Sequence, residues 1–443
     1  MPSISPVLKK DTNKDNSEKL SLKEVIAMGV GGMVGGGIFS VLGLAILLAG
    51  HAAPLAFAIG GVIAMITGLS YARLGLHYKS AGGSFTYLER AFKSQNIAGL
   101  GGWLLLVGYI GTMSLYAFTF GVYGSAMLGM DSGSNPAMHH FLQSLVILVF
   151  LAINLYGVKA SGSSELIIVT IKILILLLFA IIGLFYAKSD HLLPVFNQGI
   201  NGVLMGAALI FVAYEGFELI PNTINEMEDP QNNLLKGIVW SIAITTFVYV
   251  LVSIVAVGNL LPDEITKYKE YALAVAAKPF LGQAGFLLIG LAALFSASSA
   301  INATLFGTAR LSMVMARENE LPPAFGFRRK SNNIPWAALI IISFVTLAFV
   351  NLANLNIISS FASSTFLLIF ALINLSAWRL RKTIKIKSHM PLIGMFMSLA
   401  SWLTLMVYLW LHKPDSLIWI VVIYLAVIIA ELLFSQRRFI FKP

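Results

Sequence analysis

Three charged residues lie inside long apolar runs of this 443-residue chain: Lys172, Glu215 and Glu218. A charge at the centre of a membrane helix costs at least about 2.5–3.5 kcal/mol on insertion scales, so each needs a partner or a function. Lys172 lies too deep in its run to reach an interface easily by snorkelling. Burial favours a neutral amine and a nearby carboxylate favours the ammonium, so a change of surroundings would let Lys172 load and release a proton.

The first apolar run carries six glycines within nine positions, Gly29 to Gly37. Each glycine costs roughly 1 kcal/mol of helix propensity relative to alanine, so a continuous helix is disfavoured there. The alternative interpretation is close helix packing, because Gly32 and Gly36 match a small-xxx-small pattern. The glycines alone do not decide between a broken helix and a tight contact.

A second interruption favours the broken helix. Glu215, Gly216 and Glu218 interrupt the sixth apolar run, which corresponds to the first if the chain is built from two five-helix halves. Paired broken helices at equivalent positions indicate an inverted-repeat transporter whose binding site lies near the bilayer midplane. Unwound backbone is tolerated at that depth where it is buried or lines a cavity, and free amides at a half-helix N-terminus attract a carboxylate.

The composition places these residues in a membrane protein. The chain is 58% hydrophobic and 11% charged, whereas a soluble domain has about 25% charged residues. Zero cysteines exclude disulfides, cysteine-ligated metal and thiol catalysis. The net charge of +10 arises from basic residues in the loops, so it indicates membrane orientation and no nucleic-acid partner.

Hydropathy predicts an all-α polytopic membrane protein with twelve spans. They are expected near 22–48, 52–77, 97–129, 138–156, 162–187, 200–220, 233–258, 281–314, 335–351, 356–378, 390–412 and 415–435. These give a first repeat over 22–187, a second repeat over 200–378 and two peripheral spans over 390–435. Residues 81–93 are expected to form a re-entrant or surface helix, and 262–279 an amphipathic external segment.

The basic residues orient these spans. With cytoplasmic termini, 24 of the 30 Lys and Arg residues fall on the cytoplasmic side, five fall outside, and Lys172 lies within a span. The positive-inside rule therefore predicts a multi-pass protein of the cell (inner) membrane with both termini cytoplasmic. Residues 1–21 lack a signal-peptide pattern and are expected to form a disordered cytoplasmic tail. Residues 436–443 are expected to form a cytoplasmic C-terminal tail.

Five stretches in order resemble the amino acid–polyamine–organocation superfamily. They are GVGGMVGGGIF at 29–39, AGGSFTYLERAF at 81–92, FVAYEGFE at 211–218, NEMEDPQNNL at 225–234 and ARLSMVMARENELP at 309–322. Each motif alone is weakly specific, but the resemblance covers essentially the whole chain.

The resemblance implies a substrate site at the two broken helices. It would comprise Met33, Val34, Gly35, Gly36, Gly37, Phe211, Val212, Ala213, Tyr214, Glu215 and Gly216. The amides of Gly35 to Gly37 would hold a carboxylate, and carbonyls around Phe211 to Tyr214 would accept an α-ammonium. Relatives often carry a gating aromatic residue where this chain has Val212, next to Phe211, so the identity of the gate stays open.

Lys172 resembles a lysine that occupies the place of a sodium site in proton-dependent relatives. The resemblance thus implies proton-coupled, sodium-independent import of amino acids by alternating access. Spans 1, 2, 6 and 7 would rock against spans 3, 4, 5, 8, 9 and 10. Glu218 is expected either to stabilise the broken sixth helix or to join a proton path, and Glu215 either to face the substrate or to cap freed amides. Ser298 and Ser299 are candidates for the ion groove, or hydroxyls that bond backbone.

Other functions are less well supported. The chain lacks His-Glu-x-x-His and Gly-x-Ser-x-Gly motifs, which disfavours an enzyme, and its few buried charges suit a closed site better than a channel. No metal site or cofactor is expected. The remaining alternatives are an amino-acid exchanger and a polyamine or organocation permease. Amino acids, protons and lipids are the expected partners, with a monomer or a weak homo-oligomer as the assembly; the particular substrate stays open.

Overall fold

The computed structural model describes residues 19–80, 82–92, 95–130, 136–157, 162–318, 320–329 and 334–434. The expected C-terminal tail and most of the expected N-terminal tail lie outside these ranges. Within them the fold is all-helical, with one isolated bridge between Leu20 and Met227.

The helices of the first half follow the apolar runs closely. They are α1 (Leu22–Met33), α2 (Gly37–Ala49), α3 (Ala53–Tyr78), α4 (Gly83–Phe92), α5 (Gln95–Met127), α6 (Pro136–Tyr156) and α7 (Gly162–Tyr186). The short 3₁₀ turn η1 (Gly50–Ala52) joins α2 to α3, and η2 (Ser189–His191) follows α7. The first predicted span is thus two helices, interrupted at residues 34–36.

The second half begins with the other interrupted segment. It contains α8 (Gly199–Leu209), η3 (Ile210–Tyr214), η4 (Phe217–Glu226), α9 (Pro230–Asn259), α10 (Pro262–Tyr268) and α11 (Ala272–Arg317). These are followed by η5 (Pro323–Gly326), α12 (Trp336–Leu352), α13 (Leu355–Arg379), α14 (Arg381–Ile384), α15 (His389–His412) and α16 (Pro414–Phe434). Helix α11 begins nine residues before the predicted span, and Gly282 (φ 60°, ψ −152°) kinks it near the predicted start.

Ten helical segments of the described chain are long and apolar enough to cross a membrane. One of them, 37–78, contains both α2 and α3, and α12 is shorter at 17 residues. The chain is therefore a multi-pass helical membrane protein. The count of twelve spans stays a prediction, because neither α1 nor α12 reaches a full span length by itself.

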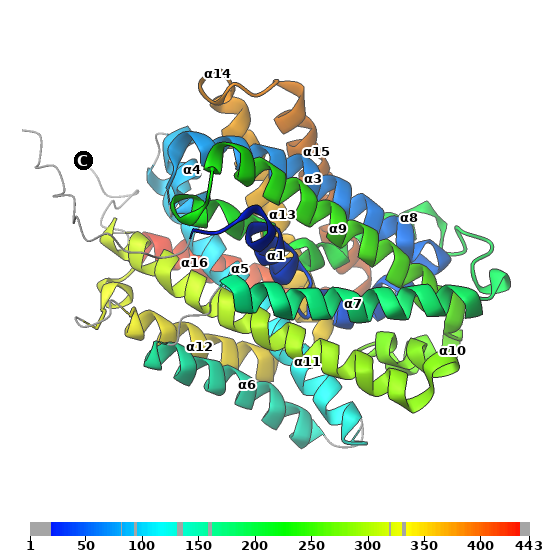
Figure 1. Ribbon diagram of the computed structural model, residues 1–443. Helices are drawn as coiled ribbons and strands as arrows, with labels where there is room; N and C mark the ends of the chain where they lie inside the picture. The colour runs from blue at the N-terminus through cyan, green and yellow to red at the C-terminus, as the bar shows by residue number, and fades with distance from the viewer. Residues whose placement is uncertain are drawn as a thin grey trace, which may run out of the picture.

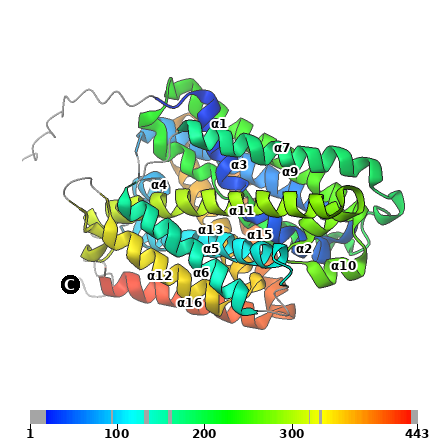
Figure 2. The same cartoon turned by 60° about the horizontal axis from the view of Figure 1, so that its bottom comes forward.

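The long helices run roughly side by side in one bundle (Figure 1). Two views agree that α4 and the C-terminal end of α16 lie at one end of the bundle and α10 at the other (Figure 2). Helices α5 and α13 are mostly buried within the bundle, whereas α15 and α16 expose most of their apolar surface. That exposure suits contact with lipid tails and agrees with a peripheral place for the last two spans.

Candidate functional site

The first helix break leaves backbone amides without partners. Helix α1 ends at Met33, residues 34–36 form bends, and α2 begins at Gly37. In the described part of the chain, the amides of Gly35, Gly36 and Gly37 donate no hydrogen bond, and the first α2 bond across the break joins the Ser40 amide to the Gly36 carbonyl. Free amides at a helix N-terminus, with the positive end of the helix dipole, attract an anionic group.

The second break covers a longer stretch of the chain than the first. Helix α8 passes into the 3₁₀ turn η3, Glu215 is extended (φ −69°, ψ 140°), and Gly216 takes φ 130° before η4 begins. Two freed amides are capped by side chains. The Val212 amide donates to Ser363 Oγ at 2.9 Å, and the Gly216 amide donates to Glu218 Oε2 at 2.7 Å. Glu218 therefore stabilises the broken segment, one of the two roles considered for it.

The two breaks touch through their backbones. A Cβ placed on Gly216 would lie 2.5 Å from the Gly32 carbonyl carbon, and one on Gly37 would lie 2.8 Å from Ala213 Cα. Helix α1 packs against η4 while α2 packs against α8 and η3, so the halves of the two interrupted segments pair in antiparallel fashion. The arrangement brings the predicted ranges 33–37 and 211–216 together.

Tyr249 of α9 joins the two breaks by hydrogen bonds. Its hydroxyl lies 2.6 Å from the Met33 carbonyl oxygen and 3.0 Å from that of Ala213, and the side chain is fully buried. The Ala213 carbonyl, expected to accept a substrate ammonium, thus already has a donor. Within the described residues the Tyr214 carbonyl has none, so it is the better candidate acceptor.

We expect Tyr249→Phe to destabilise the protein by about 1–3 kcal/mol, because two buried carbonyls lose their donor. The measurement is the thermal unfolding midpoint in detergent, and the matched control is Tyr408→Phe, at a partly exposed position on peripheral α15. Equal midpoints for the two variants would show that the Tyr249 hydroxyl does not hold the breaks together.

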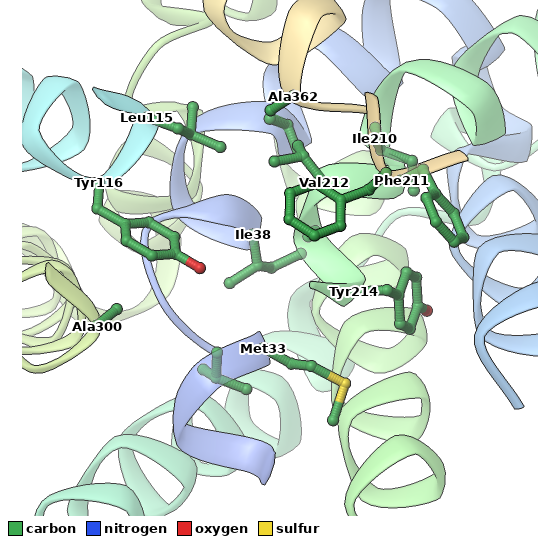
Figure 3. Packing of buried hydrophobic residues seen from close by; sticks show 14 of the residues in the cluster. Met33, Ile38, Leu115, Tyr116, Ile210, Phe211, Val212, Tyr214, Ala300 and Ala362 are labelled. Atoms are coloured by element: carbon green, nitrogen blue, oxygen red, sulfur yellow. The ribbon is translucent and has the colours of Figure 1, made fainter. Parts of the chain in front are cut away.

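One face of α5 covers the first break. Tyr116 donates to the Gly32 carbonyl at 3.2 Å, and Thr119, one turn further on, donates to the Gly36 carbonyl at 3.2 Å. A Cβ on Gly35 would lie 2.7 Å from the Tyr116 ring. Figure 3 shows Tyr116 and Ala300 on one side of the unwound segment, and Val212 and Tyr214 on the other.

The aromatic residue at this break therefore comes from α5. Val212, where the resemblance predicts a gating residue, is aliphatic, and the neighbouring Phe211 ring packs with its centroid 5.6 Å from that of the Phe370 ring of α13. Tyr116 lies against Gly35 and Gly36 instead. It is the aromatic side chain best placed to cover a ligand on these amides.

Lys172 lies on α7 with 1% of its surface exposed. Its Nζ donates to the Val34 carbonyl at 3.3 Å and to Ser299 Oγ of α11 at 3.0 Å. The amine thus joins the first break to α7 and α11, the groove between spans one, five and eight. Ser299 also donates to the Ser296 carbonyl at 3.3 Å, so it bonds its own helix backbone as well as accepting from Lys172. Ser298 is a partly exposed neighbour.

The carboxylates differ in their partners. Glu215 accepts a hydrogen bond from Thr112 Oγ1 of α5, and in the described chain it caps no amide. Its other oxygen, Oε1, is buried without a hydrogen-bond partner. A third carboxylate, that of Glu165, lies two turns before Lys172 on α7. It packs against Gly31, so a Cβ on Gly31 would clash with it. Sequence reasoning did not single out Glu165.

No group of three or more His, Asp or Glu residues that would hold a metal ion occurs in the described ranges. The groups that the structure brings together here are peptide dipoles, hydroxyls, the Lys172 amine and three carboxylates. Such a set is suited to binding a small zwitterion and a proton.

Comparison with known proteins agrees with this chemistry. Residues 20–432 match the family described as amino acid permease. The uncharacterized protein MJ0609 of Methanocaldococcus jannaschii is 35% identical over 95% of this chain and 96% of its own length. The inner membrane transport protein YbaT of Escherichia coli is 30% identical over 97% of this chain and 99% of its own length. A methylthioribose transporter of Bacillus subtilis is 28% identical over 84% of this chain and 82% of its own length.

Proposed function

This chain belongs to the amino acid permease family, and on that premise we propose that it imports amino acids by secondary active transport with alternating access. It is a permease and not an enzyme. The observation that carries the proposal is the set of free amides at Gly35, Gly36 and Gly37, in a break that packs against the second unwound segment at Gly37 and Ala213. Amides of this kind bind the carboxylate common to all amino acids and leave the side chain to the surrounding residues.

The proposed transport cycle follows the packing of the helices. Helices α1 and α2, α3, α8 with its 3₁₀ turns, and α9 form the moving bundle, in which α3 packs along α9 and α1 along η4. Helices α5, α6, α7, α11, α12 and α13 form the scaffold, in which α5 packs along α11. Tyr116 and Lys172 belong to the scaffold and donate hydrogen bonds to the first break, so movement of the break would change these bonds.

We extend the proposal to the topology. The chain crosses the membrane twelve times, with repeats over 22–187 and 200–378, peripheral spans over 390–435 and both termini in the cytoplasm. The antiparallel pairing of the two interrupted segments supports an inverted repeat. The location of α4 and the end of α16 at the end of the bundle opposite α10 supports this orientation. As a working unit we propose a monomer or a weak homo-oligomer.

We propose that Lys172 couples amino-acid transport to proton movement, with Glu218 as a second candidate. The Lys172 amine lies between the first break and α11, where its charge would exclude Na⁺ from the same groove. A change in the position of the Val34 carbonyl during transport would alter the balance between ammonium and amine. That change links proton binding to the conformation of the substrate site.

Uptake of radiolabelled amino acids into proteoliposomes tests the proposal. We expect saturable accumulation driven by an inward proton gradient, unchanged when choline replaces Na⁺ and lost on addition of a protonophore. Uptake that requires amino acid inside the vesicles would identify an exchanger. Non-saturable flux would identify a channel, and uptake of amines alone a polyamine or organocation permease.

A further inference from the structure

The side chain of Glu215 lies in the unwound part of the second interrupted segment and is 1% exposed. Thr112 Oγ1 donates to Oε2, while Oε1 is buried without a partner. No Lys, Arg or His of the described ranges forms an ion pair with it, and the nearby charged group is another carboxylate, Glu218. An isolated carboxylate is expensive to bury, so it needs either a proton or a counter-charge from outside the protein.

Glu218, three positions after Glu215, also has one buried oxygen without a partner, but its other oxygen has a structural task. One of its oxygens accepts the Gly216 amide at the start of η4, where the backbone supplies positive partial charge. This capping of the Gly216 amide explains why Glu218 is buried in the broken segment. Glu215 caps no such amide, so holding the broken backbone together does not explain it.

The location of Glu215 relative to the free amides follows from α5. Thr112, Tyr116 and Thr119 share one face of this helix and contact Glu215, Gly32 and Gly36 respectively. Seven residues separate Thr112 from Thr119, which corresponds to about 10 Å along the helix axis at 1.5 Å per residue. The Glu215 carboxylate and the Gly35 to Gly37 segment thus lie at two levels of this face of α5, with Tyr116 between the two levels. A substrate that binds both must be long.

We propose that Glu215, held by Thr112, binds a positively charged group at the far end of the substrate and makes basic amino acids the preferred class. The substrate carboxylate would bind the amides of Gly35 to Gly37, and its side-chain ammonium or guanidinium would pair with Oε1 of Glu215. This inference rests on the proposed function and names its substrate class. A side chain with positive charge supplies the counter-ion that the described protein lacks.

The test measures competition by arginine, lysine and ornithine, and by leucine and serine, in proteoliposomes that contain wild type or Glu215→Gln. The glutamine keeps the size of the side chain and removes its charge. We expect basic amino acids to compete best in wild type and their preference over leucine to fall about tenfold in Glu215→Gln. Competition by leucine should fall less than competition by the basic amino acids. Asp263→Asn, at an exposed position in α10, is the control and should retain the wild-type preference.

A second variant keeps the inference testable if Glu215→Gln does not fold. Thr112→Val removes the hydroxyl that positions the carboxylate, and we expect it to weaken competition by basic amino acids several-fold with leucine unchanged. A uniform loss for all amino acids in either variant would overturn the inference in favour of a structural role. Loss of proton-driven accumulation with intact counterflow would make Glu215 a proton carrier, and loss of Na⁺-dependent uptake would make it a sodium ligand. Absence of amino-acid uptake in wild type would instead refute the proposed function itself.

Discussion

Lys172→Ala is expected to abolish proton-driven accumulation of amino acids while amino-acid binding stays measurable. The substitution removes the titratable amine that joins the Val34 carbonyl to Ser299, but leaves the free amides of Gly35 to Gly37 in place. We expect accumulation to fall by at least a factor on the order of 100, which corresponds to about 2.7 kcal/mol. Uptake under a proton gradient and ligand-induced thermal shift measure the two properties separately.

Lys188→Ala is the matched control, because Lys188 is exposed after the end of α7. It should accumulate amino acids like the wild type. Counterflow in Lys172→Ala adds a third measurement, since exchange of labelled for unlabelled amino acid needs no net proton movement. If Lys172→Ala accumulates amino acids at the wild-type rate, Lys172 has no part in coupling.

The depth of Lys172 in its span was predictable from the sequence, but its partners were not. Hydropathy locates a span to within a few residues, which is enough to place a lysine near the bilayer centre. The contact with Ser299 depends on how α7 and α11 pack, 127 positions apart. The sequence therefore predicts that the lysine needs a partner without saying which residue provides it.

The glycine-rich stretch illustrates a different limit. The sequence left two interpretations open, a broken helix and close packing, and the structure contains both. Helix α1 continues through Gly29, Gly31 and Gly32, where a Cβ would contact Ser241, Glu165 and Gly216 respectively. The helix stops after Met33. Helix propensity summed over nine positions predicts an unstable helix. Tertiary contacts decide where the helix ends and which glycines pack against neighbouring segments.

The sequence did not predict the residues of uninterrupted helices that contact the breaks. Tyr116 and Tyr249 lie in α5 and α9, which are apolar on nearly every side, so periodicity does not indicate the face that meets the site. Thr112 and Ser363 share this problem, because hydroxyl side chains in membrane helices usually bond their own backbone. The single hydroxyl proton of Thr112 is shared in this way, because the Gly108 carbonyl lies 3.1 Å from the same Oγ1 that contacts Glu215. From one sequence, a hydroxyl that bonds a distant residue cannot be distinguished from one that bonds only its own helix backbone.

Contacts from α5, α9 and α13 satisfy part of the broken backbone within the protein. Each break frees polar backbone groups that a membrane interior does not satisfy. Hydroxyls of Tyr249, Thr119 and Ser363 bond several of these groups, and Glu218 caps another. The amides of Gly35 to Gly37 are among those left without a partner in the described chain, and they lie where the proposed substrate carboxylate binds.

Gly216→Ala is expected to have the largest effect on the fold of the site. Gly216 takes φ 130°, a conformation that alanine adopts only with strain of about 1–3 kcal/mol. The added Cβ would also lie 2.5 Å from the Gly32 carbonyl carbon and 2.6 Å from the Met33 amide nitrogen, and backbone atoms cannot move aside as a flexible side chain does. The two breaks must then separate, so we expect transport and ligand-induced thermal shift to be lost together.

Gly307→Ala is the matched control, because a Cβ at that position in α11 meets no atom within 4 Å and the helical backbone accepts alanine. It should transport like the wild type, with an unfolding midpoint that is unchanged or higher. Thermal unfolding in detergent and uptake in proteoliposomes compare the two variants under identical conditions. Normal uptake by Gly216→Ala would mean that contact between the breaks is unnecessary for transport, and the binding site would then have to be sought away from the paired unwound segments.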